Sequence, residues 1–298
     1  MSKAGATLPE ALLHTAGRGT GQLTFHLEDG PVRLSVAELA ERAHAAARTL
    51  AARGVAPGDA VGVLGPNRPE WAVWAWATWM AGAALVPIQI PLRVRDPQAF
   101  GEQLRSLVDA SGCRLVMADP RLLPALPRRV GVSWDESAPA HGADPAAPRP
   151  DDAAVIQFTS GSTAAPKGAL ITHRAVLAQM ESLEAWFAVD PAEHVLLGWV
   201  PFFHDLGLFL YLVMPPVFGG SPHYLPTERF AADPAEWLRL LTAERATLTH
   251  FPASAIGAAI RAARRSSDRI DLSSMRGAVF AGEAVDPDVA DQLLASAK

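Results

Sequence analysis

The sequence has a single cysteine, Cys113, among its 298 residues. One cysteine excludes an internal disulfide framework and is typical of proteins that work in a reducing compartment such as the cytoplasm. Cys113 opens an apolar run that continues to Met117, so we expect a buried strand residue rather than a reactive thiol. No apolar segment or cleavage signal follows residues 1–5, and we therefore expect no secretion signal.

Long hydrophobic runs and an excess of basic charge are also missing. The most apolar stretch, residues 71–86, is interrupted at Ala81-Gly82 and is shorter than the about 20 residues that a membrane-spanning helix requires. We expect it to form a buried helix that turns into a buried strand. The net charge of −5 and the pI near 6.0 argue against general affinity for nucleic acid or anionic membranes. Small molecules or proteins are the expected partners.

Three familiar catalytic signatures are absent from the sequence. No histidine or cysteine cluster has the spacing of a zinc site, so the sequence predicts no metal ligand, and there is no G-x-S-x-G elbow. The Walker A pattern also fails. Counting from Gly161, Pro166 stands where the second glycine belongs and Gly168 stands where serine or threonine belongs.

The stretch from Gln157 to Gly168 nevertheless has the composition of a phosphate-binding loop. Its small polar residues lie between two apolar runs, which indicates a tight loop between two strands. Hydroxyl and backbone N–H groups can donate hydrogen bonds to phosphate oxygens, and Lys167 adds a positive charge. The predicted polyphosphate-binding residues are Thr159, Ser160, Gly161, Ser162, Thr163 and Lys167.

Strand and helix patterns alternate along most of the chain, which predicts an α/β fold with mostly parallel sheets covered on both faces. Residues 22–26 and 32–35 are predicted to form a hairpin, and the capping box from Ser35 to Glu38 is predicted to open a helix. Prolines are frequent in residues 119–152, which we interpret as a long surface connection. The predicted organisation is an N-terminal α/β subdomain at 1–118, this connection, and an incomplete nucleotide- and acyl-binding α/β subdomain at 153–298.

The segment from Thr159 to Gly168, followed by Thr172-His173, resembles the signature loop of the adenylate-forming, or AMP-binding, enzymes. These include acyl-CoA synthetases, fatty acyl-AMP ligases and the adenylation domains of peptide synthetases. Ala164 stands where the family usually has glycine. The resemblance covers essentially the whole chain and the front portion of the family's large domain. It implies two stacked, mostly parallel sheets, and a loop that holds the β- and γ-phosphates of ATP while a substrate carboxylate attacks the α-phosphate.

A second candidate site follows an apolar strand at His204-Asp205-Leu206-Gly207-Leu208. A lone histidine in such a place is more often a core residue, but ligands bind at the strand ends of α/β sheets. The string resembles fatty acyl-AMP ligases in particular. That resemblance implies that His204 borders the reacting carboxylate and that Leu206 and the apolar residues up to Phe218 line an acyl tunnel. Asp205 either orients the His204 ring or caps the next helix.

Two further strand ends complete the predicted site. The segment Ala281-Gly282-Glu283-Ala284 resembles the family's adenine-contacting turn, with Ala281 and Ala284 in place of the usual glycine and proline. Without the resemblance, this segment would be an ordinary junction of strand, turn and helix. His250 and Phe251 end another strand, and they either line the acyl pocket or belong to the core.

The predicted function is ATP-dependent activation of a carboxylic acid to an acyl-adenylate, with Lys167 and His204 as catalytic residues and ATP and Mg²⁺ as cofactors. The apolar residues after Leu206 favour a fatty acid, and the acceptor would be CoA or an acyl carrier protein. The family's Mg²⁺-binding glutamate, ribose-binding aspartate and C-terminal-domain lysine would lie beyond residue 298. One alternative is therefore a truncated, non-catalytic fragment that binds nucleotide or docks with a partner. Another is the front part of an acyl-CoA synthetase or of a peptide-synthetase adenylation domain.

Overall fold

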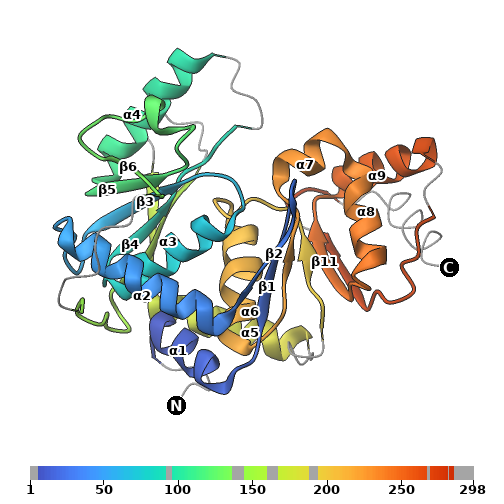
Figure 1. Ribbon diagram of the computed structural model, residues 1–298, viewed down its shortest axis with the longest axis horizontal. Coiled ribbons are helices and arrows are strands. Elements are labelled where there is room, and N and C mark those ends of the chain that lie inside the picture. The colour runs from blue at the N-terminus through green and yellow to red at the C-terminus, as the bar shows by residue number, and fades with distance from the viewer. Residues whose placement is uncertain are drawn as a thin grey trace.

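Helices and strands alternate along the computed structural model, which confirms the predicted α/β class (Figure 1). The structure describes residues 6–91, 96–135, 144–159, 167–187, 194–266, 269–280 and 282–284. Within these residues the strands form a six-stranded sheet, a four-stranded sheet and a two-stranded sheet. Most neighbouring strands are parallel, as the alternation of strands and helices predicts.

The six-stranded sheet has the order β6-β5-β3-β4-β7-β8. All pairs in it are parallel except β7 with β8, which form an antiparallel hairpin. Every residue of β3 and β4 is buried, as expected for central strands covered on both faces. The bounds are β3 (Ala60–Leu64), β4 (Ala84–Pro87), β5 (Leu115–Ala118), β6 (Gly131–Ser133), β7 (Ala153–Thr159) and β8 (Lys167–Thr172).

The four-stranded sheet has the order β2-β1-β10-β9, and the parallel pair β11-β12 continues beside it. The predicted hairpin is confirmed as β1 and β2, which pair antiparallel. A parallel bridge between Leu196 and Leu248 connects the edge at β9 with β11. The bounds are β1 (Gln22–Leu27), β2 (Gly30–Ser35), β9 (Leu197–Gly198), β10 (His223–Tyr224), β11 (Leu248–Phe251) and β12 (Gly277–Phe280).

The two larger sheets do not follow the order of the sequence. The early strand β1 pairs with β10 in the four-stranded sheet, whereas β7 pairs with β4 in the six-stranded sheet. The subdomain division at residues 119–152 thus stays a prediction, and the sheets do not coincide with it. Part of this segment also differs from the predicted surface connection. Strand β6 pairs with β5, and the alternating side chains of Val130, Val132 and Trp134 are buried, a pattern that the neighbouring prolines obscured.

Helices cover both faces of the six-stranded sheet (Figure 1). Val61 and Val63 of β3 belong to the core that includes α2 (Val36–Ala52) and α3 (Pro69–Met80), whereas Ala60 and Leu64 pack in the core under α4 (Pro97–Ser111). The larger core also includes side chains of β1 and β10, so it lies between the two stacked sheets. The remaining helical elements are α1 (Leu8–Arg18), η1 (Leu123–Ala125), α5 (His173–Phe187), the π-helical η3 (Gly207–Val213), α6 (Met214–Phe218), α7 (Thr227–Ala232), α8 (Pro234–Ala243) and α9 (Ala253–Ser266).

The capping box predicted at Ser35 places the start of α2 correctly. At α2, the Glu38 N–H donates to Ser35 Oγ at 3.1 Å and the Ser35 N–H donates to Glu38 Oε2 at 2.8 Å, which is the predicted capping box. The tryptophan-rich segment is the buried helix α3, and its Trp79 indole N–H donates to the Ala154 carbonyl at 2.8 Å. In the described part of the chain, no helix combines the length and the apolar character needed to cross a membrane.

Cys113 lies just before β5 and is buried, as the sequence predicts. Burial disfavours the charged thiolate and raises the pKa of the thiol to about 11. A thiol with this pKa is almost wholly protonated at neutral pH, so Cys113 is a structural residue.

The completely buried His173 predicts that the protein loses stability in mild acid. Burial lowers the pKa of its ring to about 4, and its Nδ1 accepts a hydrogen bond from the Leu8 N–H at 3.3 Å. Between the unfolded pKa of about 6.5 and the folded value, only the unfolded state binds the proton, so the free energy of unfolding falls as the pH is lowered through this range. By pH 5 the loss due to His173 should be about 2 kcal/mol relative to pH 7.

Urea unfolding of the wild type and of His173→Leu, each at pH 7 and pH 5, measures this contribution. The variant should be less stable at pH 7, because the buried Leu8 N–H loses its acceptor, yet it should lose less stability on acidification. The same pH dependence in both proteins would contradict the prediction.

Candidate functional site

A cavity of about 580 Å³ lies where the carboxyl ends of three parallel strands meet. Residues that follow β9, β11 and β12 contribute to its wall, and the rest comes from α5 and from the start of η3. The carboxyl edge of parallel strands is the usual ligand-binding edge of α/β folds. The cavity is lined by Gln179, Met180, Leu183, Trp199, Val200, Pro201, His204, Asp205, Leu206, Phe209, Leu210, Pro252 and Gly282.

Among the described residues that line this cavity, two have titratable side chains: His204 and Asp205. Asp205 Oδ1 lies 2.6 Å from His204 Nδ1 and also accepts the Leu206 N–H at 2.7 Å. Asp205 thus contacts the ring, as the first of its two predicted roles requires. Its hydrogen bond to the N–H of the next residue is not a helix cap, because a capping side chain accepts from the second or third N–H of a helix. A proton held on Nδ1 by this carboxylate leaves the Nε2 lone pair for a ligand. The two side chains are 55% and 64% exposed, so a ligand has access to them.

The predicted polyphosphate loop belongs to the β7–β8 hairpin. Its two described ends, Thr159 and Lys167, are partners in the antiparallel ladder, and Lys167 is exposed. The residues between them, including the predicted Ser160, Gly161, Ser162 and Thr163, lie outside the described residues. The structure thus confirms a hairpin at this point and leaves phosphate binding as a prediction.

A hydrogen bond connects the hairpin to the segment that carries His204. The Gln157 amide of β7 donates from Nε2 to the Phe203 carbonyl at 3.2 Å. Gln157 lies two residues before Thr159 in the strand, and Phe203 immediately precedes His204. The described part of the hairpin and the segment that carries His204 are therefore neighbours in space.

Asn67 is a site-supporting residue that the sequence analysis missed. It lies between β3 and α3, is 2% exposed, and its Nδ2 donates to the Val200 carbonyl at 2.9 Å. Its Oδ1 accepts the Phe202 N–H at 2.8 Å. Both partners belong to the segment between β9 and His204, so Asn67 fixes the backbone that forms one wall of the cavity.

The predicted adenine-contacting turn is described in part. Gly282 lines the cavity and has a φ of 84°, a left-handed conformation that favours glycine. Glu283 accepts a hydrogen bond from the backbone N–H of Ser254 in the first turn of α9, so its side chain holds this helix terminus. Ala284 is exposed, and Ala281 lies outside the described residues. Contact with adenine stays a prediction.

His250 and Phe251 are buried and are not among the residues that line the cavity. The His250 ring packs edge-on against Tyr211 at 5.6 Å, and burial lowers the pKa of this ring to about 4. Phe251 packs between Trp237 and Phe280, with ring centroids 4.9 Å and 5.0 Å away. These contacts support the core alternative, and a role for either residue in substrate binding stays a prediction.

Comparison with known proteins gives a consistent result. The model of the AMP-binding enzyme family matches residues 13–297. Rv1013, a provisionally named ligase of Mycobacterium tuberculosis, is 31% identical over 97% of this chain and 54% of its own length. The long-chain-fatty-acid–AMP ligase FadD26 of Mycobacterium marinum is 29% identical over 85% of this chain and 45% of its own length.

The solved structures show the same similarity. A structure from studies of the fatty acyl-adenylate ligases of E. coli and L. pneumophila superimposes with a TM-score of 0.88 and 27% identity, covering 97% of this chain and 54% of that one. The chain spans about half the length of the curated relatives it matches.

Proposed function

Because this chain belongs to the AMP-binding enzyme family, we propose that its cavity takes part in forming an acyl-adenylate from a carboxylic acid and ATP. In the proposed reaction, a carboxylate oxygen attacks the α-phosphorus of ATP. The bond from that phosphorus to the bridging oxygen of the leaving group breaks, and pyrophosphate leaves with the electron pair. Positioning of the two substrates and neutralisation of charge on the pyrophosphate are the main sources of catalysis in such a displacement.

One observation supports this proposal more than any other. His204, Leu206 and Gly282, which the sequence analysis assigned to one site, line the same cavity, and Gln157 connects the phosphate-loop hairpin to it. In this arrangement the His204 ring, oriented by Asp205, would accept a hydrogen bond at Nε2 from a water molecule bound beside the substrate carboxylate. Lys167 and the hydroxyl-rich loop would bind the β- and γ-phosphates.

The walls of the cavity favour a fatty acid over an amino acid. Met180, Leu183, Phe209 and Leu210 are apolar, which suits an alkyl chain. Among the described lining residues the sole carboxylate is Asp205, and it is already engaged by His204. An α-ammonium group would therefore lack a free anionic partner in this part of the pocket. We propose that the activated acyl group passes to the thiol of CoA or of an acyl carrier protein.

Mg²⁺ is part of the proposal only as the ion that accompanies ATP. The single described carboxylate of the cavity lies 2.6 Å from a histidine, so the described residues do not offer a separate oxygen ligand set for this hard cation. Phosphate oxygens and water would supply ligands of the ion, together with the Mg²⁺-binding glutamate that the family resemblance implies. The steps assigned to this chain are binding of the phosphates by the β7–β8 loop and orientation of the acid by His204.

ATP–pyrophosphate exchange with a series of fatty acids and amino acids tests the proposal. We expect exchange with fatty acids, and a decrease of at least about tenfold in His204→Ala and in Lys167→Ala, because each loses a charged or polar contact to a reacting group. His44→Ala is the matched control, since His44 also lies beside a carboxylate, at 2.8 Å from Asp144, on the exposed face of α2.

A binding measurement with ATP separates the alternatives. Exchange that His204→Ala and Lys167→Ala leave unchanged would overturn the assigned roles. If no acid supports exchange but ATP still binds, the non-catalytic nucleotide-binding interpretation replaces the enzymatic one. If neither is observed, the chain binds no nucleotide by itself and the docking interpretation remains.

A further inference from the structure

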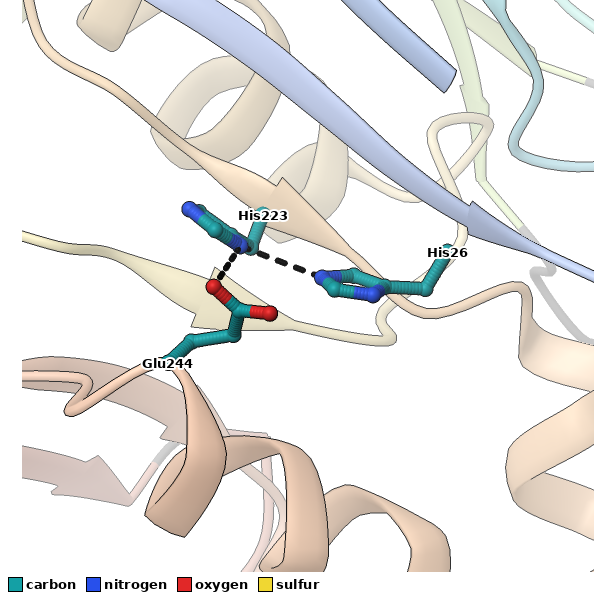
Figure 2. Close-up of side chains that lie close together, drawn as sticks. All are labelled: His26, His223 and Glu244. Atoms are coloured by element: carbon teal, nitrogen blue, oxygen red, sulfur yellow. Dashed lines mark hydrogen bonds and ion pairs between the residues drawn. The ribbon is translucent and has the colours of Figure 1, made fainter. Parts of the chain in front are cut away.

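We propose that His26, His223 and Glu244 form a zinc-binding site on the four-stranded sheet, away from the cavity described above (Figure 2). No residue of this group lines that cavity. The proposal is therefore independent of the proposed function. Figure 2 shows that the two imidazole rings and the carboxylate point toward one another from three different elements.

The distances between the three potential ligand atoms suit a single small cation. His26 Nε2 lies 3.1 Å from His223 Nδ1, and His223 Nδ1 lies 3.6 Å from Glu244 Oε2. All three atoms lie within 4.8 Å of one another. Zinc binds histidine nitrogen and carboxylate oxygen at about 2.0–2.2 Å, so tetrahedral ligand atoms are about 3.3 Å apart. Two of the separations already match, and a small rotation of the Glu244 side chain would complete the set.

The sheet register explains why two histidines distant in sequence meet. His223 is the parallel partner of Thr24, and His26 lies two residues further along β1. Side chains two residues apart in a strand point to the same face, so His26 and His223 share a face of the sheet. Glu244 ends α8, which packs beside β9 at that face. The three residues are far apart in the sequence and match no metal-binding spacing motif. The sequence analysis therefore predicted no metal ligand.

A hydrogen bond between His26 and His223 explains the arrangement of the three side chains less well than a bound zinc ion does. His223 Nδ1 can hold one proton or one lone pair, yet it faces both the His26 nitrogen and the Glu244 carboxylate. The distance of 3.6 Å to the carboxylate is too long for a normal hydrogen bond. One divalent ion would instead engage both nitrogens and the carboxylate oxygen at once, and two histidines with one glutamate are a known zinc ligand set.

The surroundings keep the ligands available. His26 is buried, and the nitrogen of an imidazole ring is a preferred ligand of zinc. The side chains of His223 and Glu244 are 12% and 30% exposed, which leaves room for water as a fourth ligand. The positive charge of Arg229 lies near the three ligands and would repel a cation. Its guanidinium, however, donates to the His26 and Leu27 carbonyls and forms an ion pair with Glu236, which offsets its charge.

The site would link three parts of the chain. The ligands come from the N-terminal hairpin, from β10 and from the end of α8. An ion that binds only when these elements are assembled stabilises the folded state. Because the three ligands come from three elements of the fold, we infer a zinc ion that holds the hairpin to the remainder of the four-stranded sheet.

Metal analysis of the purified protein tests this inference. After treatment with a chelator, incubation with ZnCl₂ and gel filtration, elemental analysis should find a single equivalent of zinc per chain. His26→Gln and His223→Gln should each weaken zinc binding by at least about tenfold, since each removes a ligand. His44→Gln is the control, because His44 lies 2.8 Å from Asp144 at an exposed position where the described residues offer no third ligand. It should bind as much zinc as the wild type.

One further variant and two further measurements test the proposal even if a histidine variant folds poorly. Glu244→Gln keeps the size of the partly exposed side chain but removes its charge, and it should also bind zinc more weakly. Co²⁺ in the wild type should give the intense visible absorption of a tetrahedral site, and this signal should be lost in the variants. Zinc should raise the melting temperature of the wild type and of His44→Gln only. Zinc content and Co²⁺ spectra equal in the wild type and in a His26→Gln/His223→Gln double variant would overturn the proposal.

Discussion

Gly207→Ala is expected to destabilise the protein by more than about 4 kcal/mol, a large fraction of the about 5–15 kcal/mol by which native proteins are stable. Gly207 is the first residue of η3, and a Cβ atom at this position would lie 2.0 Å from the Pro201 carbonyl oxygen and 2.6 Å from its carbonyl carbon. It would also lie 2.9 Å from the Val200 carbonyl oxygen. All three atoms belong to the backbone, so no rotation of a side chain can relieve the overlap.

The overlap falls on the wall of the candidate site. Val200 and Pro201 line the cavity, and the N–H of His204 donates to the Pro201 carbonyl at 3.0 Å. Any molecules of the variant that do fold must therefore displace His204 from its position. We expect them to show no detectable acyl-adenylate formation, even where far-ultraviolet circular dichroism indicates regular secondary structure.

Gly257→Ala is the matched control for this prediction. Gly257 lies within α9, where an added Cβ would meet only the Arg261 side chain, at 3.1 Å, and that long side chain can move. Because glycine is unfavourable inside helices, alanine here should be neutral or should stabilise by up to about 1 kcal/mol. Urea unfolding of both variants decides the matter. A Gly207→Ala protein as stable as Gly257→Ala would show that the close approach of η3 to the Pro201 backbone does not exist in solution.

Local sequence signals were sufficient for much of the fold. The capping box at Ser35 marks a real helix start, because a cap involves only residues within one turn. The hairpin of β1 and β2 depends only on a two-residue turn between extended segments. In contrast, helix α1 was not predicted, and β6 was taken for part of a loop. A three-residue strand among prolines has too short a pattern to be recognised without its partner.

Pairing between distant segments was the part that the sequence could not supply. β1 pairs with β10 about two hundred residues later, and no local pattern records this partner. For the same reason the sequence analysis placed a subdomain boundary that the sheets cross. It also did not group His26 with His223, since these residues become neighbours only through that pairing.

In the candidate site, too, residues with a local sequence signal were found and a residue that depends on distant contacts was missed. His204, Leu206 and Gly282 were selected because they follow strands, and the carboxyl ends of parallel strands meet at one edge. One compositional signal was stronger than the sequence analysis recognised. The 298 residues include three lysines, Lys3, Lys167 and Lys298, so a lysine within a serine- and glycine-rich loop is conspicuous. Asn67 is the sole asparagine of the sequence, but its role depends on contacts with a segment more than a hundred residues away.

Asn67→Ala is therefore expected to have the second largest effect, a loss of about 2–5 kcal/mol in the free energy of unfolding. The substitution leaves the Val200 carbonyl and the Phe202 N–H without their partner in a buried place. Each unsatisfied buried group costs about 1–3 kcal/mol. Because these groups flank Pro201, the cavity wall should also loosen, and acyl-adenylate formation should fall together with stability.

Asn67→Asp separates the two hydrogen bonds. The carboxylate still accepts the Phe202 N–H but cannot donate to the Val200 carbonyl, so this variant should lose stability at pH 7 through one contact and through the cost of burying a charge. Gln157→Ala is the matched control, since Gln157 donates one hydrogen bond to Phe203 in the same segment and should cost about 1 kcal/mol.

The double variant Asn67→Ala/Gln157→Ala then measures whether the two amides hold one structural unit. If they do, the losses will not add, because a segment released by the first substitution has less to lose from the second. Urea unfolding of the four proteins gives this coupling directly. An Asn67→Ala protein no less stable than Gln157→Ala would mean that the segment before His204 is held by its own packing. In that case Asn67 would have no part in positioning the site.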